Sequence, residues 1–169
     1  METTQERLIR YLDNAWAVEK GLVDSLKSMA QDVNDPDVSA MFQEHAQVTW
    51  RQEEALEARI RELGSEPSGT KGFFSSMMGR MSEFMQMTQD EYDRTTQNVI
   101  KAYTSEQFEM AMYQALESYA ESIGDTATAE LAQRHFQEER TAAETLWPLI
   151  AQTAERPGRL MPMPGQRVA

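Results

Sequence analysis

Hydrophobic residues recur along most of the chain at the spacing of amphipathic helices. Over residues 8–29 an apolar residue returns at every third or fourth position, which predicts one long helix. The middle of this stripe is occupied by Glu19, where the spacing calls for a leucine. Similar stripes predict further helices over residues 36–63, 88–123 and 126–153. The pattern therefore indicates an all-α protein.

Local capping signals mark where these helices begin and end. Thr3 or Thr4 is placed to cap the first helix, with Glu6 completing a capping box. Asp35 is a suitable N-cap for the second helix, because Pro36 then falls at its first position. Glycines end the second helix and form the turn before the last one. The turns at residues 34–36 and 124–126 are short, so the helices on either side of each turn are expected to pack as an antiparallel pair.

A long connection joins the two pairs. Its residues 71–87 place methionines and phenylalanines on one face, which predicts a short amphipathic helix under the crossover. A groove for a partner or a second copy is the alternative role of this face. The layout predicts a ferritin-like four-helix bundle over residues 1–155. Residues 156–169 contain several prolines and are predicted to form an irregular tail, either disordered or docked on a partner.

Polar side chains interrupt the apolar face of every predicted long helix. They are Glu19, His45, Glu106, Glu109, His135 and Glu138. Burying an ionised carboxylate costs several kcal/mol unless a partner compensates it, so this pattern predicts either a bound metal pair or a tight polar network. Carboxylates with imidazoles suit iron or manganese. Glu19 and Glu138 would be terminal ligands, with Glu109 and Glu106 bridging the ions.

Each of these residues also has a simpler interpretation. A single histidine on an apolar face is commonly a hydrogen-bonded core residue, which applies to His45 and His135. Glu19 could pair with an arginine at a helix edge, and Glu106 and Glu109 could lie half-solvated at a seam. The rival function is therefore a metal-free interaction module that dimerises through an apolar face.

Composition narrows the classes of partner. The chain has 28 acidic and 16 basic residues and a formal net charge of −12, which disfavours nucleic acid as a partner. It contains no cysteine, which excludes disulfides and thiolate chemistry. No apolar run is long enough for a membrane span, and the first residues do not resemble a signal peptide. A cytoplasmic protein is expected.

Sequence motifs in all four predicted long helices resemble one known family. They are Ala-Val-Glu-Lys-Gly-Leu at 17–22, Phe-Gln-Glu-His-Ala-Gln-Val-Thr at 42–49, Glu-Gln-Phe-Glu-Met-Ala-Met-Tyr at 106–113 and Glu-Glu-Arg at 138–140. The motif at 106–113 is the most specific. Together they resemble the YciE/YciF-type group of ferritin-like bacterial stress proteins over about residues 5–150.

The resemblance implies a ferritin-like bundle that usually forms a homodimer and is linked with general stress responses. It also implies that Glu19, Glu106, Glu109 and Glu138 are site residues. The chain departs from the family pattern at Val48, Gln52 and Ala143, where acidic residues or a histidine are usual. The resulting hypothesis is a stress-associated bundle that binds iron or manganese and reacts with oxygen or peroxide.

Overall fold

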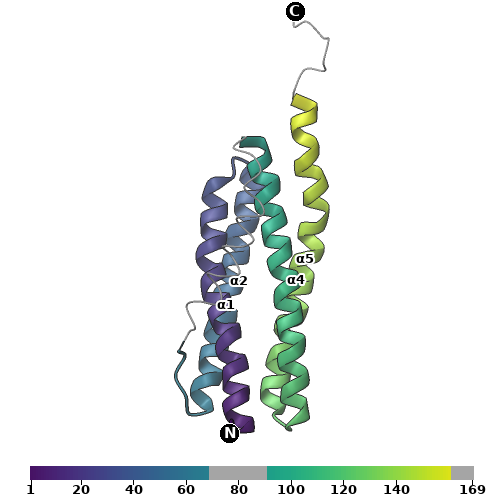
Figure 1. Ribbon diagram of the computed structural model, residues 1–169. Coiled ribbons are helices and arrows are strands. Elements are labelled where there is room, and N and C mark those ends of the chain that lie inside the picture. The colour runs from purple at the N-terminus through teal and green to yellow at the C-terminus, as the bar shows by residue number, and fades with distance from the viewer. Residues whose placement is uncertain (69–90, 161–169) are drawn as a thin grey trace, which may run out of the picture.

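The computed structural model describes residues 1–68 and 91–160, and it is built from long helices (Figure 1). The described elements are α1 (Thr4–Asp32), α2 (Pro36–Glu62), α4 (Glu91–Ser122) and α5 (Thr126–Leu160). No strand occurs within these described ranges. The predicted all-α, ferritin-like four-helix bundle is confirmed. The methionine-rich segment 71–87 lies outside the described residues, as does the predicted start of the third long helix at 88–90.

The predicted caps are present at the helix starts. The backbone N–H of Glu6 donates to the Thr3 hydroxyl at 3.2 Å, and the Thr3 N–H donates to the Glu6 carboxylate at 2.7 Å. Asp35 caps α2 by accepting from two backbone N–H groups, with Pro36 at the first helical position. These bonds satisfy donors that a helix start otherwise leaves unpaired.

Two glycines make the turns that the sequence predicted. Gly64 follows α2 with φ +79°, and Gly124 lies between α4 and α5 with φ +78°. Both angles fall in the left-handed region, which glycine adopts without the steric cost of a Cβ atom. The second turn brings α4 and α5 together as a closely packed antiparallel pair (Figure 1).

The last helix is longer than the sequence predicted. An end near Thr153 and an irregular tail from residue 156 were expected, but α5 remains helical to Leu160, through Pro148 and Pro157. Tertiary contacts hold this extension: Thr153 is buried, and Arg156 forms an ion pair with Asp35 at the start of α2. Such contacts can offset the hydrogen bond that each proline removes from the helix. Residues 161–169 lie outside the described part.

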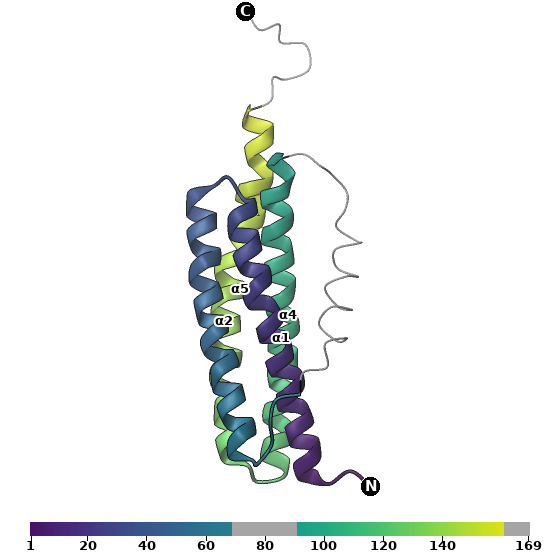
Figure 2. The ribbon, with the colours of Figure 1, turned by 90° about the vertical axis from the view of Figure 1, so that its left-hand side faces the viewer.

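The helices are arranged as two antiparallel pairs, and α5 extends past the end of the other three (Figures 1 and 2). α1 packs beside α4, and α2 packs more loosely beside α5. Two hydrophobic clusters fill the interior. The first core cluster lies around Leu12 and Leu116, and the second lies around Phe42 and Val99. The space between them along the bundle is occupied by polar side chains.

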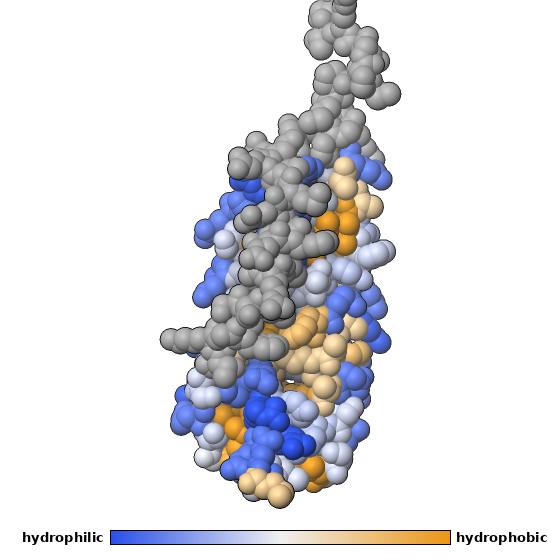
Figure 3. Space-filling model, viewed as in Figure 1, coloured by the Kyte–Doolittle hydropathy of each residue, from blue (hydrophilic) through white to orange (hydrophobic). Residues whose placement is uncertain are grey.

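The visible surface of the described residues is mostly hydrophilic (Figure 3). On the face shown in Figure 3, hydrophilic residues predominate and hydrophobic ones form smaller areas between them. Within the described ranges, none of the helices combines the length and apolar character that a membrane crossing requires.

Candidate metal centre

Five buried or nearly buried side chains, from all four described helices, converge between the two core clusters. They are Glu19 of α1, His45 of α2, Glu106 and Glu109 of α4, and Glu139 of α5. We call this group the acid cluster. It contains two overlapping triads, Glu19–Glu109–Glu139 and His45–Glu106–Glu139, and within each triad the ligand atoms lie within 4.8 Å of one another. Glu139 belongs to both triads, so the geometry offers two adjoining cation positions.

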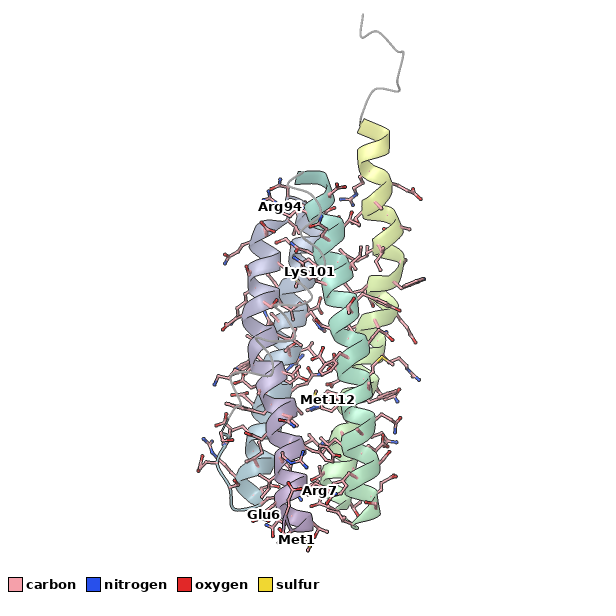
Figure 4. All side chains as sticks on the ribbon, viewed as in Figure 1. Met1, Glu6, Arg7, Arg94, Lys101 and Met112 are labelled. Atoms are coloured by element: carbon pink, nitrogen blue, oxygen red, sulfur yellow. The ribbon has the colours of Figure 1, made fainter. Side chains whose placement is uncertain are left out.

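Helical spacing places these groups at one height. Glu106 and Glu109 are three residues apart on α4, so both face the interior of the bundle. Met112, one turn beyond Glu109, lies near the middle of the bundle (Figure 4). The acid cluster is therefore central, away from the solvated helix ends.

The carboxylates are buried almost completely. Glu19, Glu106, Glu109 and Glu139 retain 0–1% of their solvent exposure. His45 Nε2 lies 2.9 Å from Glu106 Oε1, and its side chain keeps 13% exposure. Tyr113 donates its hydroxyl to Glu19, and the Gln52 amide donates to Glu139. No lysine or arginine of the described part forms an ion pair with these carboxylates, so an arginine partner for Glu19 is not found there.

Several buried polar atoms of the acid cluster lack a hydrogen-bond partner. They are the Oε2 atoms of Glu19, Glu106 and Glu109. An unsatisfied buried polar atom costs about 1–3 kcal/mol, and more when it is charged. Side-chain hydrogen bonds join Glu19 to Glu109 and Glu106 to Glu139, yet three oxygens in this small region stay without a partner. They fit cation ligands, because a metal ion would take the lone pairs that the protein leaves free.

Burial also changes how these groups titrate. Desolvation raises the pKa of Glu19 to about 8 and that of Glu106 to about 8. Desolvation and the neighbouring carboxylates raise the pKa of Glu109 and Glu139 well above its usual range. Desolvation lowers the pKa of His45. Without a cation the carboxyl groups hold protons near neutral pH, and a bound metal would replace those protons.

The structure gathers most of the sequence-predicted ligands but not all of them. Glu19, His45, Glu106 and Glu109 lie in the acid cluster. Glu138 is exposed, accepts a hydrogen bond from Gln52 at 2.9 Å and lies outside both triads. Its neighbour Glu139, the second residue of the Glu-Glu-Arg motif, belongs to both triads instead. One residue along a helix is a rotation of about 100°, which is enough to exchange the two roles.

His135 also lies outside both triads. It is buried with 5% exposure, and its ring meets the edge of Tyr113 with 5.1 Å between the ring centroids. Its Nδ1 atom has no hydrogen-bond partner. Desolvation lowers its pKa to about 4, so the imidazole is neutral at physiological pH. His135 therefore packs beside the acid cluster through Tyr113.

Gln52 and Tyr113 are functional candidates that the apolar stripe alone did not assign. Gln52 is 1% exposed and contacts Glu139, and Tyr113 is fully buried against Glu19. Each fixes the orientation of one carboxylate of the acid cluster. A glutamine on an apolar face was the available signal for Gln52. For Tyr113 the signal was its place near the candidate ligands, although core packing is the commoner role of a tyrosine on an apolar face.

The fold and the central acid cluster define a ferritin-like helical bundle with a candidate metal centre. The chain belongs to the DUF892 family, described as a domain of unknown function, whose family model matches residues 3–157.

Solved structures agree with this assignment. The stress protein YciF of E. coli has a TM-score of 0.80 at 22% identity, with 92% of this chain and 99% of that one covered. A protein from Xanthomonas campestris pv. campestris has a TM-score of 0.74 at 25% identity, with 92% and 99% covered. A two-domain Anabaena variabilis protein with DJ-1/ThiJ/PfpI-like and ferritin-like domains has a TM-score of 0.68 at 16% identity. The match to it covers 99% of this chain and 42% of that one. The YciE/YciF-type resemblance is confirmed.

Proposed function

We propose that this protein is a stress-associated ferritin-like metalloprotein that binds two iron or manganese ions in the acid cluster. The observation that carries the proposal is the pair of buried triads sharing Glu139, with unpartnered oxygens on Glu19, Glu106 and Glu109. The link to stress is taken from the similarity to the E. coli stress protein YciF. At 22% identity, the similarity to that protein supports a shared fold alone. The metal and the reaction are therefore inferred from the residues of this chain.

The ligand roles follow from the two triads. Glu19 and Glu109 would hold one ion, His45 and Glu106 the other, and Glu139 would contact both. Carboxylate oxygens with one nitrogen are typical ligands of redox-active iron and manganese. A bound pair of this kind would supply electron exchange with oxygen or peroxide.

The surrounding residues orient the ligands and exclude water. Tyr113 holds one oxygen of Glu19 and leaves the other free for an ion. The Gln52 amide donates to Glu139 from the opposite pair of helices and orients that carboxylate. The two core clusters close the site above and below, so bulk water has little access along the bundle axis. Such outer contacts commonly change metal affinity by about 10–100-fold when removed.

Metal analysis of neighbouring variants tests the proposal. Full-length protein is loaded anaerobically with Fe²⁺ or Mn²⁺, desalted and analysed for metal by mass spectrometry. We expect about two ions per chain in the wild type and a loss of at least one in Glu139→Gln. Glu138→Gln removes the adjacent but exposed carboxylate and is the matched control, with wild-type loading expected. Metal content near zero in the wild type, or equal loss in both variants, would contradict the proposal.

A metal-free interaction module is the second candidate function. The favouring observation is Trp147, which keeps 62% exposure on α5 while its ring packs against Tyr103 of α4 at a centroid distance of 5.2 Å. A large exposed aromatic beside a second one is typical of protein interfaces. In this alternative the chain forms a homodimer through the α4–α5 face and the carboxyl groups remain protonated.

Sedimentation and melting experiments separate the two functions. The interaction module predicts a dimer that Trp147→Ala weakens and a melting temperature that a chelator does not change. The metalloprotein predicts that a chelator lowers the melting temperature of loaded protein, because the metal binds only the folded state. If the protein both dimerises and loses stability with a chelator, the metal centre is its function and the dimer is the form in which the metalloprotein assembles.

A further inference from the structure

A pocket lined by both apolar and polar side chains opens on the bundle surface between α2 and α5, beside the acid cluster. Its volume is about 490 Å³, and buried Phe42, Ala102 and Leu146 contribute to its floor. Val48 and Ala142 line its sides and are half-buried. This volume lies in the range typical of small organic ligands and far exceeds what oxygen or peroxide requires.

The pocket meets the acid cluster at one side chain. His45 is the member of the cluster that lines the pocket, and it also contacts Glu106 through Nε2. Its 13% exposure contrasts with 1% for Glu106. A molecule in the pocket would therefore touch the imidazole without entering the buried carboxylate site.

The charges at the rim restrict the chemistry of the ligand. Glu44, Arg51 and Glu138 line the rim, which gives two acidic groups and one basic group. The chain as a whole carries a formal net charge of −12. An anionic ligand would be repelled by this field, whereas an uncharged ring would bury its apolar face against the floor. A hydroxyl on such a ring could donate to the Glu138 carboxylate.

We propose that this pocket binds an uncharged hydroxylated aromatic molecule, of the phenol or hydroquinone class, as the electron donor of the metal centre. The electron-donor role rests on the proposed function, but the binding does not. The overall reaction balances: hydroquinone gives two electrons and two protons and becomes benzoquinone, and hydrogen peroxide takes them and becomes two water molecules. The pocket thus supplies a reductant to a centre that is otherwise closed to solvent.

Ligand binding is measured on full-length protein by fluorine NMR with 4-fluorophenol. Ala142→Phe fills the pocket, and Ala151→Phe makes the same change at an exposed position of the same helix. We expect wild type and Ala151→Phe to bind alike, and Ala142→Phe to bind at least about tenfold more weakly. The anion 4-fluorobenzoate should also bind about tenfold more weakly than the phenol. Val48→Phe fills the pocket from α2 and replaces Ala142→Phe if that variant does not fold.

The two histidines of the chain report where the probe binds. In metal-free protein, 4-fluorophenol should shift the ring resonances of His45 and leave those of His135, which does not line the pocket, unchanged. Equal binding by wild type and Ala142→Phe, or equal binding of phenol and benzoate, would overturn the pocket assignment.

Metal content of the same preparations separates this inference from the proposed function. Metal loading without phenol binding overturns the pocket proposal alone. Phenol binding in a protein that never loads metal overturns the electron-donor role together with the metalloprotein proposal. Loaded protein that consumes hydroquinone with peroxide, and loses this activity in Ala142→Phe while keeping its metal, supports both.

Discussion

Tyr113 connects the acid cluster to the first core cluster. Its ring is fully buried among apolar residues, and its hydroxyl donates to Glu19. Desolvation raises the pKa of the Tyr113 phenol well above its usual range, so the group stays protonated and remains a donor. One residue therefore both packs the core and decides which oxygen of Glu19 is free.

Removing this hydroxyl should affect stability and metal binding together. Tyr113→Phe removes the phenol donor from a buried oxygen of Glu19, which is expected to cost about 1–3 kcal/mol of unfolding free energy in metal-free protein. Metal affinity should fall by about tenfold, because the carboxylate loses its orientation. Urea unfolding and metal titration measure the two effects.

Tyr119→Phe is the control for this substitution. The Tyr119 hydroxyl donates to the Thr4 carbonyl at 3.1 Å in an exposed setting, so its loss should change stability by less than about 0.5 kcal/mol. If the two variants lose equal stability and neither changes metal affinity, Tyr113 is only a packing residue.

The candidate site could be predicted in part from single residues. Glu19, Glu106 and Glu109 stand where the apolar stripe requires a hydrophobic residue, and periodicity found them. Glu138 and Glu139 are adjacent, so a small error in locating the buried face of the helix is enough to select Glu138 in place of Glu139 as the ligand. The structure sets that centre through the packing of buried Ala143 and Leu146, a tertiary contact that one helix's sequence does not contain.

At the scale of elements, α2 and α5 are joined at the Gly124 end of the bundle by one partly buried polar contact. Arg59 of α2 forms two bonds of 2.8 Å to the carboxylate of Asp125 and donates to the Thr128 hydroxyl at 2.9 Å. The same carboxylate accepts from the Thr128 backbone N–H at 2.9 Å, which caps α5. This contact ties the two helix pairs together where α2 and α5 otherwise pack loosely.

Asp125→Ala should destabilise the bundle through both functions of the side chain. It removes an N-cap, which costs about 1 kcal/mol, and leaves a partly buried arginine without its partner. We expect a loss of about 2–3 kcal/mol in denaturant unfolding, with unchanged metal stoichiometry. Glu62→Ala removes the 66% exposed partner of Arg59 and should cost less than about 1 kcal/mol. Equal losses in the two variants would show that Asp125 has no special role.

The helix boundaries show what local sequence can predict. Caps and turns depend on a few adjacent residues, so Asp35 and Gly64 were assigned correctly, and Thr3 is one of the two caps proposed for the first helix. The end of α5 lies beyond an ion pair between Arg156 and Asp35, two residues that are far apart in sequence. Local proline signals therefore placed the end of the helix too early.

At the scale of the whole molecule, the acid cluster lies between two hydrophobic clusters that contain most of the buried hydrophobic residues of the described part. The apolar stripes and the short turns predicted this bundle, because they require two antiparallel pairs. They could not predict the pocket between α2 and α5, because its shape depends on how far two helices from different pairs separate. Local sequence patterns therefore predict the helices and their pairing, whereas the pocket beside the site depends on how the two helix pairs pack against each other.

The acid cluster should make the stability of the metal-free protein decrease with rising pH. The pKa of Glu19 and of Glu106 is raised from 4.5 to about 8 in the folded state, chiefly by desolvation. A raised carboxyl pKa means that the folded state binds protons more tightly than the unfolded state. The contribution of these groups to the free energy of unfolding is therefore fully present below pH 4.5 and is lost as the pH rises toward 8. Each such proton changes the unfolding free energy by about 1.4 kcal/mol per pH unit.

Metal loading should reverse this dependence. A cation replaces the protons of the carboxyl groups, so its affinity, and with it the stability of the folded state, increases with pH. Urea unfolding of metal-free and loaded protein between pH 5 and 8 measures both slopes. A Glu19→Gln variant, which cannot titrate at that position, should show a shallower slope in the metal-free form. Flat profiles in both forms would mean that these carboxyl groups reach solvent and ionise normally, which is incompatible with a buried metal centre.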